Sequence, residues 1–188
     1  MTNEQIDKIF ELMIGSKPIV RENIRTLYLE RIGESIIEFC RKYYLTTRNA
    51  DIRFDFIRFI IRYARTNSQA TDLAIIALAD RSKKVRHKAI GVLAYSLKEE
   101  FIDLLENKRI ELLENIDDVT NAINAINAIK NKNHNLYRPE YDEWLVVNDI
   151  KDRHLDHEKF KEDIDLYIVK FAPETVDRLN QILGNIYN

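Results

Sequence analysis

Glycine and proline are scarce in this chain. Only four Gly and three Pro occur among its 188 residues, whereas an average globular chain is about 12% Gly and Pro. Tight hairpins, bulges and Gly-rich phosphate loops use Gly for positive φ or for close approach of the backbone. Four glycines cannot supply a β-sandwich, a β-barrel or a dinucleotide-binding fingerprint. The composition therefore predicts a mostly helical chain.

Apolar residues recur at three- and four-residue intervals along most of the sequence, a spacing that places them on one face of an α-helix. Thr2 and Gln5 have the spacing of a capping box at the start of the first helix, and the segment from Gly15 to Pro18 should end that helix. The pattern predicts further helices over 18–33, 36–44, 51–65, 68–79, 84–97, 101–114, 159–170 and 174–186. We therefore expect an all-α fold.

The middle of the chain repeats itself with a period of 33 residues. A shift of 33 positions places Arg53 on Arg86. The same shift places Ile57 on Ile90, and a weaker third copy follows one period later, where Thr120 replaces the arginine. Internal repeats of this length indicate helix pairs that stack on one another.

The best-defined copy, residues 78–93 (LADRSKKVRHKAIGVL), resembles the HEAT-repeat signature, in which an Asp-containing turn leads into Val-Arg and an Ala/Leu-rich second helix. The resemblance implies a short right-handed α-solenoid of HEAT-like antiparallel helix pairs with terminal capping helices. Such an array buries apolar faces between units and presents a concave surface. It also implies structural roles for Arg53 and Arg86, because this arginine typically pairs with a turn aspartate, for which Asp80 is the candidate.

A single domain is expected over residues 1–188, because this length suffices for one core or a short repeat array. The repeat covers residues 34–130 and is preceded by N-terminal helices in 1–33. Residues 131–188 depart from the repeat pattern, and we expect them to form an atypical C-terminal cap.

Charge is strongly segregated along the chain, although the formal net charge is only −2. Residues 48–88 hold ten Lys/Arg against four Asp/Glu, a balance of +6. Residues 99–118 hold two against eight (−6), and residues 139–177 hold five against twelve (−7). Two interpretations stand side by side: ordinary solvation of helix faces, and electrostatic complementarity to a partner.

Nine residues are candidates for binding a partner, and they comprise three arginines, three aromatic residues and three aspartates. They are Arg58, Arg62, Arg65, Tyr137, Tyr141, Trp144, Asp149, Asp152 and Asp156. The spacing of the arginines, i+4 and then i+3, places them on one helix face, and aromatic residues in loops can anchor interfaces. The tryptophan could instead plug the end of the array. Phosphate binding by the arginines is disfavoured by a pI of about 6.1 and by the acidic flank.

Motifs that would indicate a reaction are missing from the sequence. His154 and His157 could share a helix face and ligate a metal, but a solvated charge run is the simpler interpretation without a distant third ligand. HExxH, Gly-x-Ser-x-Gly and P-loop patterns do not occur. We therefore predict no catalytic residues, no metal and no cofactor.

The chain is expected to reside in the cytoplasm. Its single cysteine, Cys40, permits no internal disulfide and lies on an apolar stripe, so we assign it to the core. The polar start lacks the features of a signal peptide, and no apolar run approaches the ~18 residues that span a bilayer. No membrane partner is predicted.

These observations favour a non-enzymatic protein-binding module. Its most concrete form is a bacterial immunity-type inhibitor that binds and neutralises a cognate toxin, since several such proteins are similar to HEAT-like arrays. An acidic surface would suit a basic toxin domain, such as a nuclease. The alternatives are a scaffold or regulatory subunit of a larger assembly, and a HEAT-like DNA glycosylase with Asp142 and Trp144 near the lesion.

Overall fold

A computed structural model of the chain describes residues 2–18, 21, 24, 29, 32–111, 116–137 and 181. Their regular elements are seven α-helices and several short 3-10 helices, with no strand among them, so the all-α prediction is confirmed for these residues. The helices predicted over 159–170 and 174–186 lie almost wholly outside them. The chain divides into two compact units, residues 1–39 with 146–188 and residues 40–145, which we treat separately. The single-domain organisation stays a prediction.

The first unit begins with helix α1 (Asn3–Ile14), which the sequence predicted together with its cap. The Gln5 amide donates to Thr2 Oγ1 at 3.2 Å, and the Thr2 amide donates to Gln5 Oε1 at 2.8 Å. This reciprocal capping satisfies two amides at the helix start. Phe10 packs against Phe39 with ring centroids 5.8 Å apart. The buried face of α1 consists of the predicted residues Ile6, Ile9, Phe10 and Met13.

The second unit contains most of the described helices. Helix α4 (Ile36–Thr46) enters it at residue 40 and is followed by α5 (Ala50–Ile60), η3 (Ile61–Tyr63), α6 (Ser68–Ala77), α7 (Lys83–Ser96), η4 (Glu99–Phe101), α8 (Ile102–Glu111), α9 (Ile116–Lys130) and η5 (His134–Leu136). Most bounds agree with prediction to within a few residues. The exception is the helix predicted over 51–65, which ends at Ile60 and tightens into the 3-10 turn of η3.

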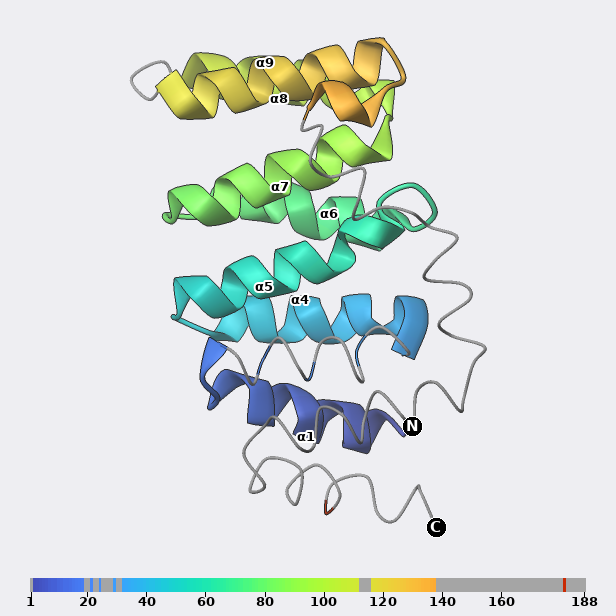
Figure 1. The fold of residues 1–188 in the computed structure, drawn as a ribbon, viewed down its shortest axis with the longest axis vertical. Helices are drawn as coiled ribbons and strands as arrows, with labels where there is room; N and C mark the ends of the chain where they lie inside the picture. Colours follow the sequence, from blue (N-terminus) through green and yellow to red (C-terminus); the bar gives the residue numbers. More distant parts are fainter. Residues whose placement is uncertain are drawn as a thin grey trace. The chain divides into compact units, whose positions relative to one another are not determined.

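Helix α7 is the most enclosed helix of this unit. It contacts α6 beside it and also packs against both α5 and α9, while α8 pairs with α9 (Figure 1). Residues 89–96 of α7 are buried without interruption, as expected for a helix covered on several sides. None of the described helices has the length and apolar character needed to cross a membrane.

One sequence assignment to the core is confirmed in the stretch where the repeat begins. Cys40 is fully buried, and burial raises the pKa of its thiol well above the ordinary value.

The helix stop between α4 and α5 contains neither Gly nor Pro. Instead, Asn49 caps α5 by accepting a hydrogen bond from the Asp51 amide at 2.9 Å. A polar side chain thus supplies the boundary in place of a Gly or Pro signal.

Candidate functional site

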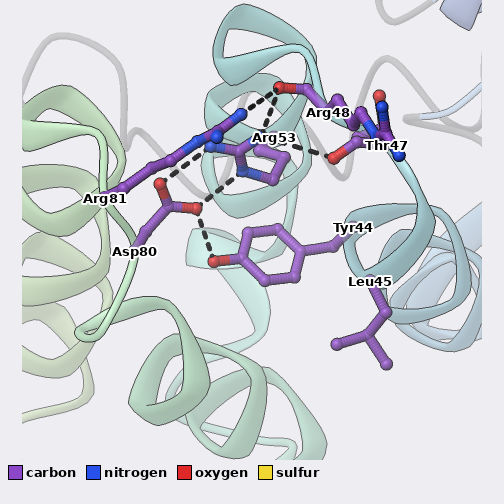
Figure 2. Close-up of a pocket in the computed structure, with 7 residues that line it drawn as sticks. All are labelled: Tyr44, Leu45, Thr47, Arg48, Arg53, Asp80 and Arg81. Atoms are coloured by element: carbon purple, nitrogen blue, oxygen red, sulfur yellow. Dashed lines mark hydrogen bonds and ion pairs between the residues drawn. The ribbon is translucent and has the colours of Figure 1, made fainter.

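A buried ion pair joins α5 to the turn between α6 and α7. Arg53 Nε lies 2.7 Å from Asp80 Oδ2, and Arg53 Nη2 lies 2.9 Å from Asp80 Oδ1 (Figure 2). The third nitrogen of the guanidinium, Nη1, donates to the carbonyls of Arg48 at 2.7 Å and of Thr47 at 3.3 Å. One arginine therefore holds together its own helix, the turn before that helix and the turn between α6 and α7. The pairing of Arg53 with Asp80 predicted from the HEAT resemblance is confirmed.

The Asp80 carboxylate has two further donors. The Tyr44 hydroxyl donates to Oδ2 and the Ser82 amide donates to Oδ1, each at 2.8 Å. Burial alone would raise the pKa of Asp80, but the hydrogen bonds from Arg53, Ser82 and Tyr44 outweigh it, so the pKa lies below its ordinary value. Burial, followed by the bond to this carboxylate, raises the pKa of Tyr44. The cluster is therefore a fixed ion pair at neutral pH.

The contacts to backbone carbonyls recur one 33-residue period later, and there the arginine meets a different carboxylate. Arg86 Nη1 donates to the carbonyls of Asp80 at 3.0 Å and of Arg81 at 3.2 Å. Its Nη2 lies 2.7 Å from Oδ2 of Asp118, a fully buried residue of α9 that also contacts His87. The predicted side-chain pairing of Arg86 with Asp80 is thus wrong. The Asp80 carboxylate is already occupied, and the packing of α9 on α7 brings Asp118 within reach.

A pocket of about 520 Å³ opens beside the first ion pair, and we call it the turn pocket. Its lining residues are Tyr44, Leu45, Thr47, Arg48, Arg53, Asp80 and Arg81 (Figure 2). Arg48 and Arg81 are exposed and occupy equivalent positions, 33 residues apart, in the α4–α5 turn and the α6–α7 turn. Arg81 Nη2 donates to the Arg48 carbonyl at 3.3 Å. With one aspartate against three arginines, the lining has a formal charge of +2.

The three arginines predicted to share a binding face do not line the turn pocket. Arg58 lies on α5, Arg62 lies in η3, and Arg65 follows both, so the continuous α-helix assumed for their spacing ends before Arg62. Arg65 Nε donates to the Tyr95 carbonyl at 3.0 Å, and its guanidinium lies 4.4 Å from the centre of the Tyr95 ring. Its Nη2 also approaches His134 at 3.1 Å. Arg65 thus makes contacts inside the unit.

Tyr137, a predicted interface anchor, is buried with 8% of its surface exposed. Its hydroxyl is placed to donate to the His87 carbonyl at 3.0 Å and to Asn121 Oδ1 at 3.2 Å. Its ring lies over Gly91, where a Cβ atom would come within 3.1 Å of Tyr137 Cε1. This contact explains the glycine in the middle of α7.

The remaining predicted binding residues lie outside the described part of the chain. They are Tyr141, Trp144, Asp149, Asp152 and Asp156, and the histidines considered as metal ligands, His154 and His157, lie there as well.

Part of the charge segregation is neutralised within the second unit. Lys83 at the start of α7 pairs with Asp117 in the first turn of α9, and Lys84 pairs with Asp51 on α5. The pair of Lys83 with Asp117, like that of Arg86 with Asp118, joins the basic residues 48–88 to the acidic segment 99–118, whereas Lys84 pairs with an acid of its own segment. Ion pairs within the unit therefore explain part of the charge segregation, for which the sequence analysis had considered only solvation of helix faces or complementarity to a partner.

Sequence reasoning did not propose Arg48 and the turn pocket as a site. The signal was present, because the 33-residue shift that aligns the repeats also places Arg48 on Arg81. Comparisons with known protein families, curated proteins and solved structures found no match for this chain.

Proposed function

We propose that this chain is a non-enzymatic protein-binding module whose HEAT-like helix pairs form a short α-solenoid. The observation that carries the proposal is the repetition of one structural device. Arg53 binds the carbonyls of residues 47 and 48, and Arg86 binds those of residues 80 and 81, each 33 residues further on. Equivalent contacts at equal spacing support a repeat architecture, and repeat arrays characteristically present extended binding surfaces.

The use of the ionisable side chains also supports a binding role. Arg53 and Asp80 bond to each other, and Arg86 and His87 both bond to Asp118. These groups could serve acid–base chemistry elsewhere, but here they connect helices. A surface held in place by such contacts binds a partner with less loss of conformational freedom.

In its most concrete form, the module is a bacterial immunity-type inhibitor that acts in the cytoplasm and neutralises a cognate toxin. A toxin domain with a basic surface would match the acidic sequence of residues 139–177. Binding there would block the substrate site of the toxin, which requires no chemistry from the inhibitor.

Affinity capture and growth rescue test this function. The tagged full chain should capture one stoichiometric protein from its native cells, and co-expression of the chain should restore growth to cells that produce this protein. Charge reversal at Asp149, Asp152 and Asp156 should abolish rescue if the acidic segment carries recognition, with reversal at Arg58 and Arg62 as the matched comparison. Failure to rescue growth would rule out the inhibitor. Binding of duplex DNA at low salt would instead favour the glycosylase.

A further inference from the structure

We propose that the turn pocket binds an acidic side chain of an extended partner segment, with a neighbouring aliphatic side chain of that segment resting on Leu45. The inference rests on the proposed protein-binding function and gives one partner contact a chemical identity. Three features of the turn pocket carry it: two arginines that have no carboxylate partner among the described residues, an exposed leucine, and backbone contacts that hold both arginine-bearing turns.

The first feature is uncompensated positive charge. Among the described residues, neither Arg48 nor Arg81 has a carboxylate partner, whereas Lys83 and Lys84 close by are each paired with an aspartate. The Asp80 carboxylate in the pocket wall does not offset this charge, because it is bound on both oxygens by Arg53. A guanidinium fork matches the two oxygens of an incoming carboxylate.

The second feature is that both arginines are presented from anchored backbone. The Arg48 carbonyl is held by Arg53 at 2.7 Å, and the Arg81 carbonyl is held by Arg86 at 3.2 Å. Arg53 and Arg86 thus each fix a turn that carries an exposed arginine. Anchored turns lower the entropic cost of binding, since only side chains remain to be ordered.

The third feature is the apolar part of the lining. Leu45 is 61% exposed on the pocket wall, and covering such a side chain is favourable. The turn pocket therefore suits a Glu or Asp followed by an aliphatic residue. A nucleic acid fits less well, because a phosphate backbone requires a row of available cations and the neighbouring Lys83 and Lys84 are already paired.

The test uses the isotope-labelled full chain and N-acetyl-Glu-Leu-amide as the probe, followed by nuclear magnetic resonance. We expect saturable shifts of the Arg48 and Arg81 side-chain signals and of the Leu45 amide signal. The matched probe N-acetyl-Gln-Leu-amide should bind about tenfold more weakly, because it lacks the charge that the arginines recognise.

Substitutions in the lining test whether the glutamyl probe binds in the turn pocket. Arg48→Gln and Arg81→Gln should each weaken binding of the glutamyl probe several-fold, and the double variant should show no saturable binding. Arg41→Gln is the matched control, because Arg41 is an exposed arginine of α4 that does not line the pocket. Thermal unfolding of each variant verifies that the fold is retained.

Several results would overturn the inference. Equal binding of the glutamyl and glutaminyl probes would do so, as would unchanged binding to the double variant. Tighter binding of N-acetyl-phosphoserine-Leu-amide, inorganic phosphate or a short DNA duplex would replace the carboxylate with a phosphate ligand. The proposed function can fail separately. If the chain binds the glutamyl probe but rescues no toxin-producing cell, carboxylate binding by the turn pocket is supported and the inhibitor function is excluded.

Discussion

Arg53 and Asp80 face each other through two contacts, with Nε 2.7 Å from Oδ2 and Nη2 2.9 Å from Oδ1. The two side chains are 8% and 4% exposed. Desolvation of two charges is costly, so a buried pair adds little net stability relative to well-packed apolar residues. Removing only one of the two side chains is strongly destabilising, because the charge of the other then stays buried without compensation.

Asp80→Asn should lower the free energy of unfolding by about 3 kcal/mol or more, because Arg53 keeps its charge and loses its partner. Urea denaturation measures the change. The matched control is Asp72→Asn, at an exposed aspartate of α6, which should barely move the midpoint. Equal midpoints for the two Asn variants would contradict the role assigned to the pair.

The contribution of Asp80 should depend on pH. Its pKa is lower in the folded chain than in the unfolded chain, where it is about 3.9. Its stabilising effect is therefore fully present above about pH 4 to 5 and is lost as the pH falls through the folded pKa. The difference in unfolding free energy between wild type and Asp80→Asn should stay constant near neutral pH and shrink in acid. A difference that stays unchanged into strong acid would argue against a lowered pKa.

Asp117 and Asp118 are sequence neighbours that should respond very differently to the same substitution. The Asp118 side chain is fully buried and bound by Arg86, whereas the Asp117 side chain is 63% exposed in its pair with Lys83. Asp118→Asn should cost about 3 kcal/mol. Asp117→Asn should leave the urea midpoint nearly unchanged, because an exposed pair is screened by water and salt. Similar losses for both variants would show that burial does not decide the cost.

The effect of Gly91→Ala on the free energy of unfolding should change sign with the residue at position 137. Alanine favours a helix over glycine by about 1 kcal/mol, but its Cβ would press on the Tyr137 ring, which is buried and held by its hydroxyl. We therefore expect Gly91→Ala to destabilise the wild type and to stabilise a Tyr137→Ala variant by about 1 kcal/mol. A double-mutant cycle of unfolding free energies isolates the coupling. Additive effects would mean that the ring moves aside freely.

The helices were largely predictable because their signals are local. The capping box of α1, the apolar stripes and the polar stop before α5 lie within a few residues of the structure that they specify. The same reasoning failed beyond Ile60, where apolar and basic spacing continued although the α-helix did not. Spacing reports which face a residue would occupy in a helix and does not report where the helix tightens.

The candidate site was less predictable, because its geometry joins residues far apart in the chain. The partnership of Arg53 with Asp80 was expected from a resemblance, but that of Arg86 with Asp118 was not. Tyr137 was predicted to anchor an interface because it is aromatic. In the structure its ring instead packs against Gly91 of α7. Exposure cannot be read from residue type alone, since an aromatic ring serves a core and an interface equally well.

The sequence by itself determined that the described chain is helical, where most of its helices begin and end, and that its middle repeats every 33 residues. These properties follow from backbone propensities, caps and apolar periodicity, which act over one or two helical turns. Only the tertiary structure decided which carboxylate Arg53 and Arg86 each meet and that Arg48 and Arg81 line one pocket. Such contacts join residues about 30 positions apart, and only the packing of whole helices brings them within bonding distance.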